Sequence, residues 1–301
     1  MTAYAGRMDS TDFPEQSPAR DTVLVAAFEG WNDAGGAATA AVLHLVEQLG
    51  ATKVADIDPE EFYDFQVNRP VVATEEDGSR SLTWPTTTFA TATVGSRRLV
   101  LVHATEPSMR WRTYCAEVLR IADTHGVGTV VTLGGLLADV PHSRPIPVTA
   151  TSDDLATRAL LDLPSSSYEG PTGIVGVLQA AAREHGMHAL SVWAAVPHYV
   201  AHAPSPKATL ALLSRLEELL RITVPLGDLV DDARAWEDGV DVLAGEDEEI
   251  AEYVAQLEAA KDAVDLPEAS GDAIAREFER YLRRREDGRG EGPARPGGPA
   301  A

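Results

Sequence analysis

Short apolar runs that alternate with helical patterns constrain the fold of this 301-residue chain more than any other feature. The apolar runs are Thr22–Phe28, Leu99–His103, Gly128–Leu133 and Ala189–Ala195. Continuous runs of this length are typical of parallel strands that are buried on both faces. Helical patterns lie between or after them, at 40–49, 109–124, 153–161, 174–184 and 206–220. The alternation predicts a layered α/β fold with a mostly parallel central sheet.

The remaining strands are predicted at the margins of this pattern. Thr52–Ile57 and Ile146–Ala150 are short apolar segments, and Ser81–Trp84 and Thr87–Val94 alternate as antiparallel strands do. The sequence Asp58-Pro59-Glu60-Glu61 has the capping residue, proline and acids of a helix start. We therefore expect a helix to begin there.

The character of the chain changes after Pro225. Apolar residues recur at helical spacing in three stretches, which predicts a helical appendage. Between residues 228 and 268 we count fifteen acidic residues against two basic ones. The sequence thus divides into a disordered leader (1–20), an α/β core (21–225), an acidic helical appendage (226–287) and a disordered tail (288–301).

Charge and cysteine content exclude several classes of protein. The formal net charge of −22 disfavours a protein that grips nucleic-acid phosphates or docks on anionic membranes. The sequence contains no apolar run of about 20 residues and no secretory signal, so we expect a cytoplasmic protein. Cys115 is the only cysteine, which rules out a disulfide framework and a thiolate zinc site.

Ligands of open α/β sheets bind beyond the carboxyl ends of the strands, so the residues that follow each predicted strand are the candidates for a site. They would rim one crevice with carboxylates, amides, aromatic rings and glycine backbone. The candidates are Glu29, Asn32, Asp33, Glu106, Gly134, Gly135, Thr172, His198 and Tyr199.

The glycine-rich candidates have a plainer explanation. The cluster at 30–36 precedes a helix, yet it matches neither dinucleotide nor P-loop fingerprints and lacks the P-loop lysine. We favour a turn with a helix cap at Asn32 or Asp33. Gly134-Gly135 is similarly interpreted as a tight strand exit, and Thr172-Gly173 as a helix N-terminus; ligand contact at each stays open.

The histidines and acids form no evident catalytic constellation. His198 and His202 are four apart, but the prolines around them favour a loop over a metal-binding helix face. His103 ends a predicted strand, beside Glu106, and could serve as a general base, although we favour a hydrogen-bonded structural histidine. We assign no catalytic residue, metal or cofactor. We interpret the acidic residues of the appendage as a solvated helix face. The alternative is an arm that binds a basic partner.

Five ordered strings are more specific than these patterns. They are FEGWNDAG at 28–35, DPEEFYDF at 58–65 followed by Arg69-Pro70, GGLLADVPHSRP at 134–145, YEGPTGIVG at 168–176 and SVWAAVPHYV at 191–200. Together they resemble the bacterial branch of the proteasome assembly chaperone 2 family, from about Val23 to Leu220. The resemblance implies a phosphorylase/hydrolase-like fold without the phosphorylase activity.

The resemblance also implies a function. Archaeal and eukaryotic members bind proteasome α-subunits and help the ring assemble, so proteasome α-subunits are the expected partners and a homo-oligomer, with a trimer favoured, is the expected form. A non-enzymatic, assembly-chaperone-like protein is therefore expected. The alternative is an enzyme that acts on a small nucleoside-like or carboxylate substrate in the same crevice. The chain ends Gly298-Pro299-Ala300-Ala301 and lacks the hydrophobic–tyrosine tail of such chaperones, so docking would use the folded surface.

Overall fold

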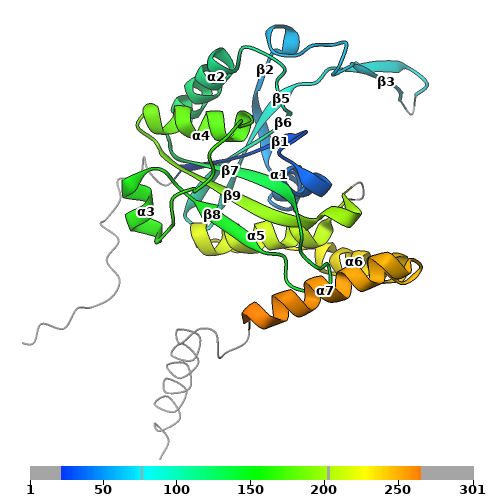
Figure 1. Ribbon diagram of the computed structural model, residues 1–301. Coiled ribbons are helices and arrows are strands. Elements are labelled where there is room, and N and C mark those ends of the chain that lie inside the picture. Colours follow the sequence, from blue (N-terminus) through cyan, green and yellow to red (C-terminus); the bar gives the residue numbers. More distant parts are fainter. Residues whose placement is uncertain (1–21, 76, 202–203, 266–301) are drawn as a thin grey trace, which may run out of the picture.

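The computed structural model describes residues 22–75, 77–201 and 204–265 (Figure 1). The predicted leader and tail, His202, and the third apolar helical stripe of the appendage lie outside the described residues. The division into a core at 21–225 and an appendage at 226–287 therefore stays a prediction. None of the helices in the described ranges is long and apolar enough to cross a membrane.

A seven-stranded sheet forms the centre of the molecule, in the order β2-β5-β6-β1-β7-β9-β8. The strands span Thr22–Glu29 (β1), Thr52–Ile57 (β2), Thr87–Val94 (β5), Arg97–Thr105 (β6), Val127–Ala138 (β7), Val148–Thr151 (β8) and His188–Pro197 (β9). The four central strands β6, β1, β7 and β9 are mutually parallel, while β5 and β8 run antiparallel to their neighbours. The predicted α/β class with a mostly parallel sheet is confirmed.

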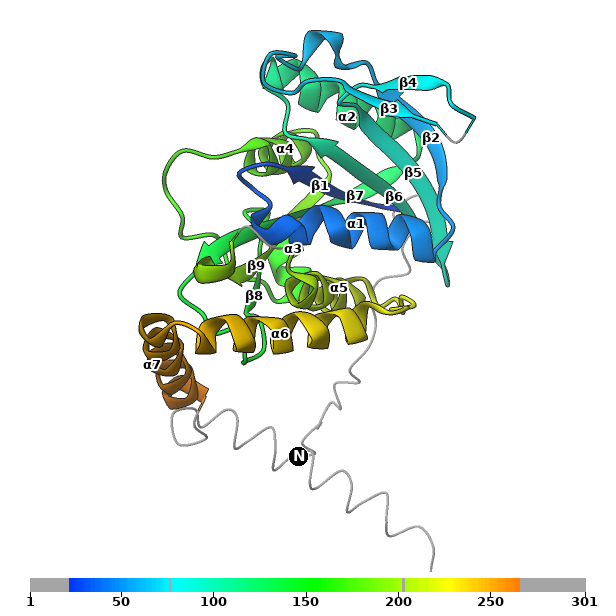
Figure 2. The same cartoon turned by 90° about the vertical axis from the view of Figure 1, so that its right-hand side faces the viewer.

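Helices cover both faces of the sheet, which explains why its central strands are apolar on both sides. In β1, Val23, Val25 and Ala27 pack with α1 (Ala37–Gln48) and α5 (Pro206–Leu220). The alternate side chains of β1 pack with α2 (Trp111–Thr124) and α4 (Ile174–Glu184) on the other face. Figure 2 shows these two helical layers above and below the sheet. The short helix α3 (Leu155–Leu161) lies near β9.

The C-terminal part of the described chain consists of two helices. Helix α6 (Leu229–Gly245) packs on α5, and α7 (Glu248–Asp265) packs on α6 (Figure 2). Buried Ala233, Val240 and Ala244 line the inner face of α6. Two of the expected apolar helical stripes thus form helices at the predicted places.

Three local expectations differ from the structure. The helix expected at Asp58 is only a 3-10 turn, Pro59–Glu61, although Asp58 does accept the Glu60 backbone N–H at 2.9 Å. The strand β4 (Arg80–Thr83) pairs with an additional strand, β3 (Val71–Thr74), in a hairpin separate from the main sheet. The strand expected to end at Leu133 continues through both glycines to Ala138.

Candidate functional site

The carboxyl ends of β1 and β6 are joined by a partly buried hydrogen-bond network. The Asn32 amide donates to a carboxylate oxygen of Glu106 at 2.8 Å. The same Glu106 oxygen accepts the backbone N–H of Ile174, the first residue of α4, also at 2.8 Å. Glu106 therefore caps α4 across a long sequence separation and ties the turn after β1 to that helix.

Asp33 fixes the other side of the same turn. Its buried carboxylate accepts the backbone N–H of Ala38 at 2.6 Å and both the N–H and the hydroxyl of Thr39, in the first turn of α1. Burial raises the pKa of the Asp33 carboxyl, although the hydrogen bonds from Thr39 and Ala38 oppose the rise. The structure agrees with the turn-and-cap interpretation of residues 30–36.

Gly134 and Gly135 are needed for close packing within a continuous strand. A Cβ atom at Gly134 would lie 2.4 Å from the ring of Trp193 on β9. At Gly135 it would lie 2.8 Å from the Ala34 carbonyl oxygen, and the Gly135 N–H donates to the Asn32 carbonyl at 2.8 Å. Gly134 therefore leaves room for the Trp193 ring, and Gly135 leaves room for the turn after β1.

Gly173 has a comparable role at the start of α4. A Cβ atom there would lie 2.3 Å from the Asn32 side-chain oxygen and 2.8 Å from Glu106. Thr172 is exposed, and its hydroxyl lies over Gly176 in the first turn of the helix. One edge of the sheet, at the carboxyl ends of its strands, thus brings together Asn32, Asp33, Glu106, Gly135 and the Thr172 segment.

Trp31 stands out on this rigid turn because its side chain is almost completely exposed, at 97%. The two residues after it are held by the Asn32 and Asp33 side-chain hydrogen bonds and by the bridge between Asp33 and Gly135. Gly30, just before it, accepts the Asp33 backbone N–H at 3.1 Å. We call Trp31 and the turn that carries it, residues 30–33, the Trp31 surface. Exposed aromatic residues on a fixed backbone are typical anchors of protein interfaces.

His198 and Tyr199 do not lie in this crevice but beneath the C-terminal helices. The Tyr199 hydroxyl accepts the backbone N–H of His142 at 2.8 Å and contacts its ring nitrogen. The rings of His198 and Tyr199 pack edge-on against Tyr253 of α7, with centroids 5.4 and 6.2 Å away. His198 also approaches Asp139, at 3.3 Å. These two candidates therefore help to anchor α7 to the core.

The motif at 134–145 holds both C-terminal helices, α6 and α7, against the core. His142 is fully buried, and its second ring nitrogen lies 2.9 Å from Asp241 on α6. Ser143 donates to Glu258 of α7, and the Arg144 guanidinium makes two 2.8 Å hydrogen bonds to Asp262 of the same helix. Several acids of the appendage are thus engaged by the core rather than free to bind a basic partner.

Arg144→Ala is expected to speed hydrogen exchange of the α7 backbone amides about fivefold. The bidentate contact with Asp262 is exposed to solvent, so its loss should increase local opening of α7 only modestly. The matched control is Arg120→Ala, because Arg120 makes a similar two-bond contact with Glu117 within α2. Unchanged α7 exchange in Arg144→Ala, measured by mass spectrometry, would show that this pair does not hold the helix.

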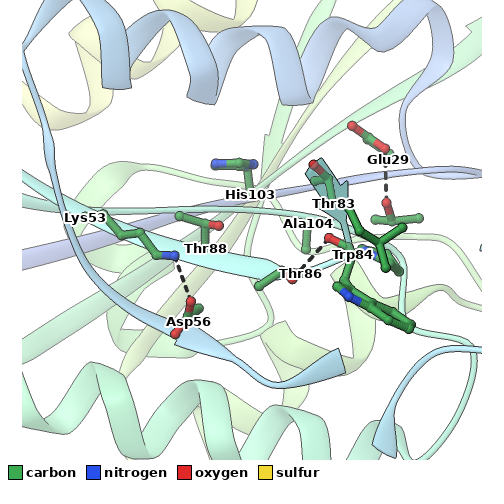
Figure 3. Close-up of a pocket in the computed structure, with 12 residues that line it drawn as sticks. Glu29, Lys53, Asp56, Thr83, Trp84, Thr86, Thr88, His103 and Ala104 are labelled. Carbon is green, nitrogen blue, oxygen red and sulfur yellow. Dashed lines mark hydrogen bonds and ion pairs between the residues drawn. The ribbon is translucent and has the colours of Figure 1, made fainter. Parts of the chain in front are cut away.

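Glu29 faces a separate, open cavity of about 550 Å³ (Figure 3). Its carboxylate accepts a hydrogen bond from the Thr105 hydroxyl at 3.1 Å. The cavity lining is Glu29, Lys53, Asp56, Leu82, Thr83, Trp84, Pro85, Thr86, Thr88, His103, Ala104 and Thr105. Burial lowers the pKa of the half-buried His103, and the nearby Glu29 carboxylate opposes this shift. In the described chain His103 has no hydrogen-bond partner, and its charged neighbour is Glu29 rather than Glu106.

Eight of the nine candidates therefore separate into an edge network, a helix anchor and a cavity, and Gly134 packs against the Trp193 ring. Asp33, His198 and Glu29 do not converge on one point. Sequence reasoning did not single out Trp31, Lys53, Trp84 or Thr88. Trp31 alone had a usable signal, since a tryptophan between glycine and asparagine in a turn has no apolar stripe to join. Across the described ranges, no group of three or more histidine, cysteine, aspartate or glutamate side chains is placed to hold a metal ion.

Three features define the class of this α/β protein. They are the layered sheet, the capped turn after β1 and the C-terminal helices that are anchored on the last strands of the sheet. The model of the PAC2 family matches residues 27–244, and the chain belongs to that family. It is similar to a PAC2 family protein of Streptomyces avermitilis, with 54% identity, coverage of 78% of this chain and 100% of that one, and a TM-score of 0.74. No curated protein matches the chain.

Two further solved structures share this fold. The proteasome-assembly chaperone homologue of Mycobacterium tuberculosis is 49% identical, with 77% of this chain and 99% of that one covered and a TM-score of 0.70. PbaA of Pyrococcus furiosus, an archaeal homolog of proteasome-assembly chaperone, is 16% identical, with a TM-score of 0.54 over 80% of this chain and 96% of that one. The likeness to PbaA is one of fold alone.

Proposed function

We propose that this protein is an assembly-chaperone-like binding protein that docks its partner through the Trp31 surface. The observation that carries the proposal is the almost fully exposed Trp31 on a turn held by buried and partly buried hydrogen bonds. A preorganised turn loses little conformational entropy when an aromatic anchor is buried, so more of the contact energy is available for binding.

The chemistry of the partner follows from the surroundings of Trp31. The indole ring supplies the apolar contact, and the exposed acid Glu29 lies two residues before it in the chain. The complementary face would have an apolar pocket for the indole ring, rimmed by basic groups. Proteasome α-subunits are the proposed partner, which the family and the proteasome-assembly chaperone homologue support.

Self-association and location are further parts of this proposal. The chain is proposed to form a homo-oligomer, with a trimer expected from the family resemblance, and to act in the cytoplasm. The folded surface is proposed to make the contact with the α-subunit.

Size-exclusion chromatography with light scattering tests the proposal. The protein is run alone, which gives its oligomeric state, and then mixed at micromolar concentration with the proteasome α-subunit of its host. We expect a co-eluting complex whose mass exceeds that of either component. Separate peaks at this concentration would contradict α-subunit binding, whichever oligomer the first run shows.

A further inference from the structure

The cavity next to Glu29 has a floor made of side chains on adjacent strands. Asp56 of β2 pairs with Thr88 of β5, and Thr88 pairs with His103 of β6. Directly paired residues point to the same face of a sheet, so these three side chains form a row across the strands. Glu29 of β1 and Thr105 of β6 pair with each other, two residues beyond His103 along β6. The backbone beneath this floor is rigid, because each residue is held in the sheet ladder.

One wall of the cavity comes from the end of β4 and from the segment that joins β4 to β5. Leu82, Trp84 and Pro85 supply apolar surface there, and Thr83 and Thr86 supply hydroxyl groups. The Trp84 ring is held edge-on by Phe65, with ring centroids 4.8 Å apart. In Figure 3, Glu29 and His103 lie toward one side of the group and Trp84 toward the other. The cavity therefore has a polar floor and a flat apolar wall.

Its position in the fold is also one where α/β proteins bind ligands. The cavity reaches the carboxyl ends of β1 and β6, at Glu29 and Thr105. The helix after β1 packs on one face of the sheet, and the helix after β6 packs on the other. Open sheets bind ligands in the crevice where successive connections diverge in this way.

The charges of the cavity select against anions. Lys53 is paired with Asp56 at 2.7 Å, which leaves the Glu29 carboxylate without a basic partner among the lining side chains. Burial favours the neutral form of the His103 imidazole, through the lowered pKa described above. The chain as a whole carries −22. A phosphorylated or carboxylate ligand would thus be repelled.

We propose that this cavity binds the sugar ring of a small neutral ligand, either a free saccharide or the ribose of a nucleoside. Sugar hydroxyls would donate to Glu29 and exchange hydrogen bonds with His103 and the threonine hydroxyls, since these groups both donate and accept. The apolar face of the sugar, or the base attached to it, would pack on Trp84. The volume lies within the range of small-molecule sites.

Saturation-transfer difference NMR on the full chain tests this assignment. The probes are methyl glucoside, ribose and adenosine, with ribose 5-phosphate as the anionic counterpart and spermidine as a cationic one. We expect transfer to at least one neutral probe; adenosine alone would identify a nucleoside site, and the free sugars a saccharide site. The assignment is overturned if no neutral probe shows transfer at about 10 mM, or if the phosphate or the polyamine binds more tightly.

Glu29→Gln is expected to weaken the bound neutral ligand about tenfold, because a hydrogen bond to a charged acceptor is replaced by one to a neutral amide. Glu60→Gln is the matched control, since Glu60 is outside the cavity lining, and its affinity should equal that of the unaltered protein. Trp84→Ala provides a second variant and should also weaken binding. Titration by NMR gives each dissociation constant. Unchanged affinity in both Glu29→Gln and Trp84→Ala would place the ligand elsewhere.

Discussion

Trp31→Ala is expected to weaken binding of the proteasome α-subunit about 30-fold or more without lowering the stability of the protein. Truncating an aromatic anchor at an interface commonly costs about 2 kcal/mol or more, and 1.4 kcal/mol corresponds to a tenfold change in affinity. The side chain is 97% exposed in the free protein, so the free energy of unfolding should change by less than about 0.5 kcal/mol. Isothermal titration calorimetry and thermal unfolding measure the two quantities.

The control for this variant is Leu155→Ala on α3. Leu155 is also a highly exposed apolar residue, but it lies outside the Trp31 surface. Its affinity for the partner should be unchanged. If Trp31→Ala and Leu155→Ala bind equally well, Trp31 is not an anchor, even where the unaltered chain co-elutes with the α-subunit.

Gly134→Ala is expected to lower the free energy of unfolding by about 2 to 3 kcal/mol. The new methyl group would overlap the Trp193 ring, whose nearest atoms would lie at 2.4 and 2.5 Å. Both residues are on the central strands β7 and β9 and are paired with each other, so neither backbone can retreat. Overpacking of this kind forces side chains from their rotamers and typically costs 1–3 kcal/mol.

The same substitution elsewhere in the chain should have the opposite effect. A Cβ atom at Gly239, within α6, meets no atom within 4 Å. Gly239→Ala is therefore expected to stabilise the protein by up to about 1 kcal/mol, because alanine is the better helix former. Urea unfolding of both variants gives the comparison. Equal stability of Gly134→Ala and the parent chain would mean that Trp193 moves aside freely.

The edge network shows how far strand-end reasoning reaches. Because parallel strands end at a common edge, Asn32 and Glu106 could be placed together although they are distant in sequence. Their actual partners were not predictable. Glu106 caps α4, and Gly173 is required by the volume of the Asn32 amide; both facts depend on how closely α4 approaches the turn.

His198 and Tyr199 show where the same reasoning stops. They do follow a parallel strand, and yet their rings pack on Tyr253, a residue of the appendage. A strand-end residue faces a crevice only if no other part of the chain covers it. The amphipathic pattern of α7 predicts that one face of the helix is buried. It does not predict which part of the protein covers that face.

The sequence by itself determined the layered α/β class, because apolar runs without alternation can be buried only in a sheet covered on both faces. It also determined the sites of most helices and the turn-and-cap role of residues 30–36, since both depend on neighbouring residues. Tertiary structure alone decided the cavity and the Trp31 surface. The cavity depends on the pairing that aligns Asp56, Thr88 and His103, and the exposure of Trp31 depends on what the folded chain leaves uncovered. The pairing of β2 with β5 and the exposure of Trp31 both depend on packing between segments that are distant in sequence, which no local pattern encodes.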